Sequence, residues 1–382
     1  MPFYQKRGKI PSKKHTQFRN ETGELFSEEL VSRGGFSSVY SNIYHTNPPT
    51  ALKAIGESIP HKLAGVSSRH QLLHIDSSNI KSDGDSIFSR IPLFYNEDIV
   101  ISKAHVSSPM NFLYRNGCSD EILFIHEGTG SYESSFGIID LKPGDYLVIP
   151  RGVIWKIIPD DKLKILVIES REPIETPKRY RNEFGQLLEH SPFCERDIVT
   201  PKHNTSLATG QVDVMVKLSD GIQKYTYLHH PFDVIGWDGY YYPYAFNISD
   251  FMPITGKIHQ PPPVHQTFQS KSFVVCSFVP RLFDYHPNSI PAPYAHSNID
   301  SDEIIYYVDG DFMSRKGVKK ESITYHPMGL PHGPQPGKTE ESIGAKETNE
   351  FAVMIDTFKK INITKSAMGV SVDDYPFSWI EK

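Results

Sequence analysis

The sequence has little of what marks several large classes of protein. Only three of its 382 residues are cysteines (Cys118, Cys194 and Cys276), an odd and sparse set that offers neither a disulfide framework nor zinc-finger spacing, and so favours a reducing cytoplasm. No apolar run approaches the ~18 residues of a membrane span, and the first residues lack the apolar core of a signal peptide. Phosphate-cradling glycine motifs and a G-x-S-x-G elbow are also missing. We therefore expect a cytoplasmic protein that neither spans a membrane nor binds a dinucleotide.

The chain also has little excess charge of either sign. The formal net charge is -5, and basic residues form no dominant block apart from "KRGKIPSKK" at residues 6–14. We interpret that stretch as a solvated or mobile tail and not as a polyanion surface. No nucleic-acid partner and no membrane partner is expected.

Proline, glycine and aromatic residues are plentiful, with 29 Pro, 26 Gly, 20 Tyr and 22 Phe. This mixture favours short strands and many turns. Residues 98–106 alternate as a strand does, residues 121–158 read as strands separated by the turns "EGTG" and "KPGD", and a second β-rich block begins near residue 211. Helical periodicity is weak, and the one candidate is a short helix at residues 177–190.

The two β-rich blocks share a skeleton. Glu121 is followed seven residues later by Gly128 and then by "PRGVIW", and Glu303 is followed seven residues later by Gly310 and then by "PMGLPH". Strand phase and turn residues match together, so we interpret the pattern as two copies of one barrel built from hairpins.

This skeleton, E-x6-G followed by P-x-G-x-x-(W/H), resembles the motifs of the cupin superfamily. The resemblance implies an all-β bicupin with two antiparallel jelly-roll barrels and few short helices. We expect residues 1–190 to hold an N-terminal region with a metal-free structural barrel. Residues 191–382 are expected to hold the C-terminal barrel with the metal site.

The two copies differ in what they offer a metal. The first has Trp155 where the second has His332, and no histidine shortly precedes Glu121, which we expect to make a salt bridge or hydrogen bond. The second offers His296, Glu303 and His332, the two imidazoles and one carboxylate of a non-haem Fe(II) facial triad, although Zn(II) or Mn(II) would accept the same ligands.

Any single one of the 17 histidines is more often a surface residue than a ligand, and Asp302 competes with its neighbour Glu303. Strand alternation turns the two carboxylates to opposite faces, and the E-x6-G skeleton selects Glu303. Three residues together at cupin positions outweigh the interpretation that each is an ordinary surface residue.

The C-terminal half supports a narrower resemblance. "PYAHSNIDSDE", "GDFMSRKG", "YHPMGLPHGPQPG" and "TKSAM" resemble the homogentisate 1,2-dioxygenase family. The resemblance implies an Fe(II) enzyme that converts homogentisate and O₂ to maleylacetoacetate in tyrosine and phenylalanine breakdown. It also implies a homo-oligomer based on trimers. It is weak over the first 90 residues.

The same resemblance assigns roles to single residues. His296, Glu303 and His332 match the iron ligands. His259 matches the catalytic acid/base, with His265 as the alternative. Tyr294, His326 and His332 match the substrate site. The sequence departs from the family pattern at two places. The stretch between His296 and Glu303 is one residue longer than in animal members of the family, and Phe312 stands where some members have a substrate-site tyrosine from a neighbouring subunit.

Other functions stay open at this point. A cupin dioxygenase of the gentisate type, or one acting on another hydroxylated aromatic, would use the same triad. A non-oxidative cupin isomerase or decarboxylase usually carries a further histidine in an H-x-H pair, but the residues two positions from His296 are Tyr294 and Asn298. A non-enzymatic bicupin storage or binding protein is the third class, and the retained triad argues against it.

Overall fold

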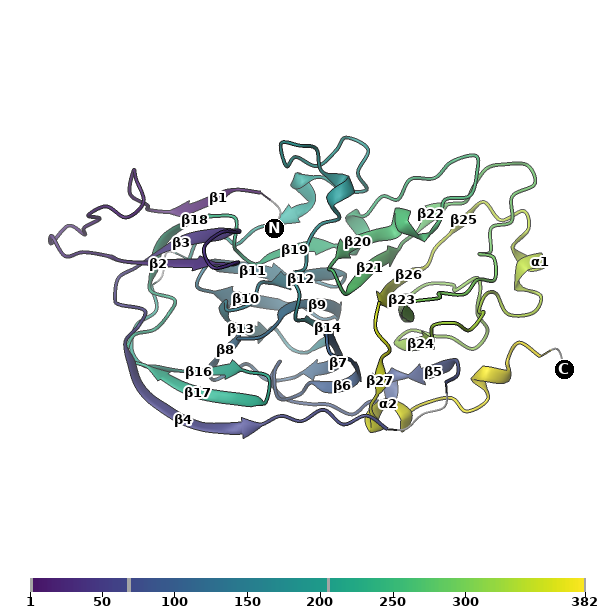
Figure 1. The fold of residues 1–382 in the computed structure, drawn as a ribbon, viewed down its shortest axis with the longest axis horizontal. Helices are drawn as coiled ribbons and strands as arrows, with labels where there is room; N and C mark the ends of the chain where they lie inside the picture. The colour runs from purple at the N-terminus through teal and green to yellow at the C-terminus, as the bar shows by residue number, and fades with distance from the viewer. Residues whose placement is uncertain (1–2, 67–69, 205–206, 381–382) are drawn as a thin grey trace.

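A computed structural model describes residues 3–66, 70–204 and 207–380 of the chain (Figure 1). The described fold is almost entirely β, as predicted, with two short α-helices, α1 (Lys338–Ser342) and α2 (Lys365–Met368). Neither helix has the length and apolar character that crossing a bilayer requires. Short 3-10 turns lie at Ser77–Asn79, Lys178–Tyr180, Glu195–Asp197, Ile248–Asp250, Pro262–His265 and Tyr375–Phe377.

Two large sheets form the N-terminal barrel. The first has seven strands in the order β11 (Gly137–Leu141), β10 (Gly130–Ser134), β13 (Ile154–Pro159), β8 (Leu113–Asn116), β16 (Val212–Lys217), β17 (Gly221–Tyr227) and β4 (Leu52–Pro60). The second has eight, in the order β15 (Ile198–Val199), β19 (Tyr244–Asn247), β12 (Asp145–Ile149), β9 (Asp120–Glu127), β14 (Leu163–Ser170), β7 (Ile99–Val106), β6 (Ile91–Tyr95) and β27 (Asn362–Ile363). Neighbouring strands are antiparallel except β8 and β16, which are parallel.

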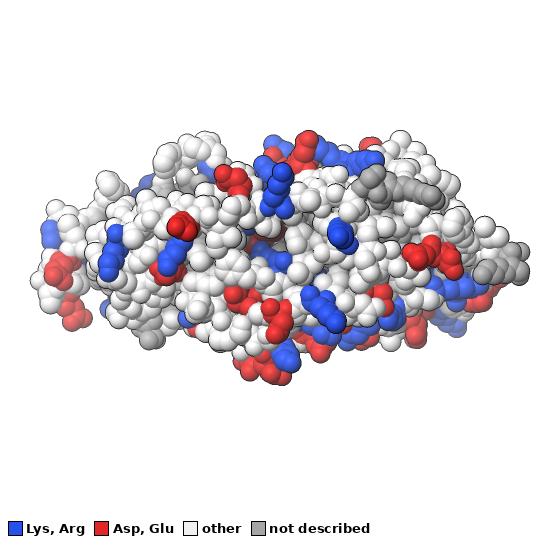
Figure 2. Space-filling view, turned by 90° about the horizontal axis from the view of Figure 1, so that it is seen from below, with Lys and Arg blue, Asp and Glu red and all other residues white. Residues whose placement is uncertain are grey.

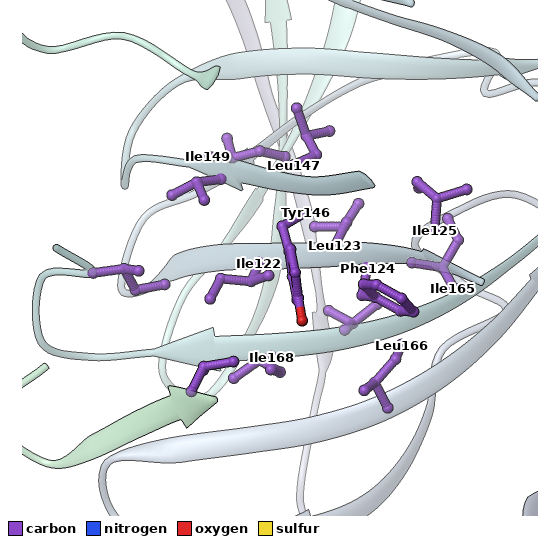
Figure 3. Close-up of a cluster of buried hydrophobic side chains, with 14 of the residues drawn as sticks. Ile122, Leu123, Phe124, Ile125, Tyr146, Leu147, Ile149, Ile165, Leu166 and Ile168 are labelled. Carbon is purple, nitrogen blue, oxygen red and sulfur yellow. The ribbon is translucent and has the colours of Figure 1, made fainter. Parts of the chain in front are cut away.

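The eight-stranded sheet is buried on both faces. One face lines the N-terminal barrel, and the other meets the C-terminal sheet, where the Tyr146 hydroxyl lies 2.8 Å from Ser277 Oγ and the ring of Phe124 is 6.4 Å from that of Tyr306. This double burial explains why its central strands are almost wholly apolar. Figure 3 shows their packed side chains, among them Ile122, Leu123, Phe124, Ile125, Tyr146, Leu147, Ile149, Ile165, Leu166 and Ile168.

The C-terminal barrel has one regular wall. Its six-stranded sheet runs in the order β20 (Gln266–Gln269), β21 (Phe273–Phe278), β26 (Phe351–Thr357), β23 (Asp302–Asp309), β24 (Ser322–His326) and β5 (Leu73–Asp76). Opposite it, the described pairing is reduced to β22 (Arg281–Leu282) with β25 (Glu347–Thr348) and to an isolated bridge between His296 and His332. Loops from residues 251–261, 283–301 and 327–337 complete this side.

The sheets do not follow the predicted division at residue 190. β5 comes from the N-terminal part of the chain but pairs with β24, whereas β27 and α2 come from its end and pack on β6. Strands β16, β17 and β19 follow residue 190 and lie in the sheets of the N-terminal barrel.

A four-stranded sheet covers one end of the N-terminal barrel. Its order is β1 (Gln5–Gly8), β18 (Val234–Gly239), β3 (Tyr40–His45) and β2 (Ser27–Ser32). Residues 6–8 of the predicted solvated or mobile tail pair with β18 and are therefore ordered, while Lys6 and Gly8 remain exposed to solvent. On the face shown in Figure 2, basic and acidic side chains are interspersed.

The predicted helix at residues 177–190 is also wrong. Lys178–Tyr180 form a single 3-10 turn, and the chain then folds back so that Arg181 bridges to Leu187. Asn182 caps this reversal by accepting hydrogen bonds from the backbone N–H groups of Phe184 and Gln186 through its side-chain oxygen, and Gly185 adopts a φ of 81°. Local turn chemistry here wins over weak helical periodicity.

The repeated skeleton has a structural cause in both barrels. Gly128 and Gly310 have φ values of 91° and 99°, and a Cβ would lie 1.9 Å from the Lys162 carbonyl oxygen in one case and 2.0 Å from that of Asn349 in the other. Only glycine fits such a position. The acid before each skeleton glutamate also repeats. Asp120 accepts hydrogen bonds from the N–H groups of Arg151 and Ile174, and Asp302 accepts them from those of Met328 and Ile361.

Candidate metal centre and substrate cavity

Three predicted ligands converge in the C-terminal barrel. Glu303 is the second residue of β23, His332 follows the P-x-G turn after β24, and His296 lies in the loop before β23. The backbones of His296 and His332 exchange two hydrogen bonds of 2.8 Å, which hold their rings 4.4 Å apart. One donor atom from each of the three side chains lies within 4.8 Å of the other two. This spacing suits a single metal ion.

Histidines surround the carboxylate of Glu303. Its oxygens lie 2.5 Å from His326 Nδ1, 3.5 Å from His332 Nε2 and 3.9 Å from His296 Nε2. Burial pushes the pKa of Glu303 upward, but the three imidazoles outweigh burial and hold that pKa well below its usual range. Glu303 is therefore an anion, as a metal ligand must be.

His326 lies behind the ligands. Its ring stacks on that of His332 at 4.3 Å, and its side chain is fully buried. Burial lowers the pKa of His326 to about 4, although Glu303 acts in the opposite direction. A neutral imidazole that donates its Nδ1–H fixes the orientation of the carboxylate, as partners of metal ligands commonly do.

The first barrel shows what the same positions hold without a metal. Tyr114 pairs with Trp155 across β8 and β13 as His296 pairs with His332, and Glu121 takes the place of Glu303. The guanidinium of Arg90 lies among them. It is 2.5 Å from Glu121 Oε1 and 5.6 and 6.0 Å from the ring centroids of Tyr114 and Trp155. The predicted salt bridge of Glu121 is thus confirmed, and the cation of this centre is a side chain.

The C-terminal centre has no such built-in cation. Within the described ranges, no lysine or arginine forms an ion pair with Glu303, and the buried His332 Nε2 has no hydrogen-bond partner there. Asp356 adds a second acid, because it is directly opposite Glu303 on β26, as Glu169 is opposite Glu121 on β14. Two imidazoles and a carboxylate that lack an internal cation fit a divalent transition metal.

A second group of possible ligands, His126, Glu127 and Glu321, lies between the barrels. Lys103 and Lys164 both bind the Glu321 carboxylate. Two ammonium groups already neutralise this carboxylate, so the group is an ion-pair network and not a second metal site.

The metal centre opens into a cavity of about 460 Å³. Aromatic side chains form part of its wall, and acidic and basic groups project into it. The lining includes His259, His265, Arg281, Tyr294, His296, Glu303, Tyr307, Phe312, Arg315, Glu350 and Asp356. A cavity of this volume accommodates a substrate of one aromatic ring with polar substituents.

Comparisons with known proteins find similarity to dioxygenases. Residues 95–248 match the family model described as homogentisate 1,2-dioxygenase N-terminal. The chain is 42% identical over 383 aligned residues to "Putative dioxygenase SSO1533" of Saccharolobus solfataricus, with 99% of each chain covered. It is 28% identical to homogentisate 1,2-dioxygenase of Bradyrhizobium diazoefficiens over 68% of this chain and 61% of that protein.

The chain belongs to the same family as this putative dioxygenase of Saccharolobus solfataricus, and it is similar at lower identity to the homogentisate 1,2-dioxygenases. It matches 61% of the length of the relatives that carry this enzyme name. Among solved structures, a cupin 2 conserved barrel domain protein from Leptotrichia buccalis overlaps 78% of this chain and 99% of its own at a TM-score of 0.35 and 11% identity. The description of the barrels therefore rests on the strand pairing, and not on that overlap.

The predicted substrate and acid/base residues lie at different depths in this family member. Tyr294 and His259 line the cavity mouth with their rings 5.1 Å apart, and Nδ1 of His259 is 3.4 Å from Asp284 Oδ2. His265 also lines the cavity but is buried, and burial lowers its pKa to about 3. His326 is behind the ligands and is not among the lining residues. These roles stay predictions.

Sequence reasoning missed several charged residues of the cavity, among them Arg281, Arg315, Glu350 and Asp356. Asp356 left one signal, a carboxylate inside the apolar strand "FAVMIDT". The other three lie in loops or short strands without periodicity. Only the folded chain brings them to the metal centre.

Proposed function

We propose that this protein is an Fe(II)-dependent ring-cleaving dioxygenase that converts homogentisate and O₂ to maleylacetoacetate. The observation that carries the proposal is the His296–Glu303–His332 centre, which faces a cavity and lacks the internal cation of its first-barrel counterpart. Bound Fe(II) would supply open coordination positions for substrate and O₂ and the redox chemistry of ring opening.

The cavity favours an aromatic acid. The Nε of Arg315 is buried without a hydrogen-bond partner among the described residues, while its NH1 donates to the Gly333 carbonyl at 2.6 Å. Nearby, Tyr307 and Phe312 pack with ring centroids 4.6 Å apart. A guanidinium beside aromatic walls suits a ring that bears a carboxylate arm, as homogentisate does.

His259 is the preferred acid/base. Asp284 lies within ion-pair distance of its Nδ1, an arrangement that orients the imidazole and leaves Nε2 free to exchange a proton with a phenolic hydroxyl. His265 has no such carboxylate partner, since its Nδ1 is buried and unpartnered among the described residues. A His–Asp pair supports general-base chemistry near neutral pH better than an isolated buried imidazole does.

O₂ uptake by anaerobically reconstituted Fe(II) protein tests the proposal. Homogentisate should be consumed with one equivalent of O₂ and give an ultraviolet-absorbing product. O₂ uptake with gentisate but not with homogentisate would instead support a gentisate-type reaction. If the protein is isolated with Zn or Mn and shows no iron-dependent O₂ uptake, the dioxygenase proposal is wrong.

The arginine contact can be tested separately. Arg315→Gln should raise the KM for homogentisate by roughly tenfold or more, because a charge-assisted contact to the carboxylate is lost. Arg196→Gln, at an exposed position outside the cavity, is the matched control. An unchanged KM in Arg315→Gln would mean that the carboxylate binds elsewhere.

A further inference from the structure

A second cavity lies at the end of the N-terminal barrel. Its volume is about 550 Å³, and it shares no lining residue with the metal-centre cavity. Its walls come from β2 and β3 of the covering sheet, from β8, and from the "PRGVI" turn before β13. This is the barrel whose metal position is filled by Arg90, so the cavity has no role in the proposed reaction.

The acids in this cavity are already paired. Asp233 lies 2.7 Å from His45 Nδ1 and accepts further hydrogen bonds from Thr46 and Asn47, and Glu29 lies 3.1 Å from His45 Nε2. Burial opposes protonation of His45, but the two carboxylates prevail and raise its pKa to about 9. Each of the two carboxylates thus contacts one ring nitrogen of His45, and the three side chains satisfy one another.

The arginines are not paired in this way. Arg115 projects from β8 into the cavity and makes no hydrogen bond or ion pair with a described residue, and its Nε is buried. Arg151 also lines the cavity. Its guanidinium donates to the carbonyl of Arg171, but its Nε is buried and unpartnered in the same part of the chain. The charge of Arg115 helps to lower the pKa of Glu29, but neither carboxylate in the lining forms an ion pair with Arg115 or Arg151. A guanidinium whose Nε is buried and unpartnered can still donate hydrogen bonds to an anion.

The remaining wall is largely apolar. Val31, Ile43, Phe136, Val153 and Ile154 contribute aliphatic and aromatic surface beside the arginines. Counting His45 as charged, the lining carries three cations (with Arg115 and Arg151) against two carboxylates (Glu29 and Asp233), a formal excess of one positive charge. A ligand that complements this cavity has a single negative charge on an apolar body.

We propose that the N-terminal cavity is a second small-molecule site that binds an organic carboxylate. Arg115 would hold the carboxylate, and Ile43, Phe136 and Val153 would contact the apolar part. The volume lies within the range of roughly 300–1,000 Å³ typical of ligand sites. A phosphate dianion fits less well, because the lining carries a formal excess of only one positive charge.

Fluorine NMR of 4-fluorobenzoate with the full chain tests this site. We expect a bound resonance that Arg115→Gln weakens by roughly tenfold or more in affinity. Arg315→Gln should leave this resonance unchanged and should weaken only a second resonance, which comes from probe in the metal-centre cavity. Arg196→Gln is the control for an arginine at an exposed position. Unlabelled benzoate should displace the probe, whereas inorganic phosphate should not.

Several results would overturn the proposal. They are the absence of a bound resonance at millimolar probe, equal affinity in Arg115→Gln, loss of the signal in Arg315→Gln alone, and displacement by phosphate but not by benzoate. If Arg115→Gln fails to fold, Arg115→Lys decides. Lysine keeps the charge but lacks the two-pronged geometry, so its affinity should fall below that of the wild type, and an unchanged affinity would contradict the assignment.

Discussion

Removing the guanidinium of Arg90 should show how much this side chain stabilises the first barrel. Arg90→Met keeps an unbranched apolar side chain but deletes the cation between Glu121 and Glu169. Glu169 retains Lys217 at 2.6 Å and Asn116 at 3.0 Å. Glu121 retains no hydrogen bond or ion pair among the described residues, because its Oε1 is bound by Arg90 and its Oε2 already lacks a partner, although the charge of the more distant Lys217 still favours its anion. The substitution therefore isolates one buried carboxylate.

The cost follows from that single charge. Deleting one partner of a buried pair typically destabilises a protein by about 3–5 kcal/mol, and Glu121 is fully buried. The double variant Arg90→Met/Glu121→Leu removes both charges and should recover most of the loss, since apolar replacement of a buried pair is often close to neutral. Burial already raises the pKa of Glu121 despite Arg90. Without Arg90 this pKa should rise further, so the single variant should lose less stability at acidic than at neutral pH.

Urea unfolding of the iron-free protein at two pH values measures these differences, with Arg196→Gln as the exposed control. A loss below about 1 kcal/mol for Arg90→Met would refute the reasoning, as would a double variant less stable than the single one. Bound iron should be the same in all variants, because the C-terminal centre is untouched.

Three further outcomes are expected. His332→Ala should abolish iron binding, measured by metal analysis, with little change in circular dichroism; retained iron would remove His332 from the ligand set. Trp155→Ala should cost about 3–5 kcal/mol in urea unfolding, because Trp155 is fully buried, and a cost near zero would contradict its core position. Burial opposes ionisation of Glu321, yet Lys103 and Lys164 lower its pKa from 4.5 to about 2. The stability that ionised Glu321 contributes to the fold is therefore complete above pH 4.5 and is lost as pH falls toward 2. Glu321→Gln should flatten that part of the curve of unfolding free energy against pH.

The convergence of His296, Glu303 and His332 could be predicted because local geometry fixes where these residues lie. The E-x6-G spacing reflects a glycine that no other residue can replace, and the P-x-G turn sets where His332 emerges. Arg90 could not be predicted as the partner of Glu121, because it lies 31 residues away along the chain, outside both repeats. The exchange of β5 and β27 was equally hidden, since short edge strands carry no signal for which sheet they join.

Strand exchange has a consequence for how a bound metal acts on the whole chain. Because β5 completes the C-terminal sheet and β27 completes the N-terminal one, opening either barrel pulls a strand from the other. The two barrels should thus unfold in one cooperative step. By mass action, a metal ion bound by His296, Glu303 and His332 should then raise the unfolding midpoint of the N-terminal barrel as well. In cells short of this metal, the entire polypeptide would therefore lose stability, and not the C-terminal half alone.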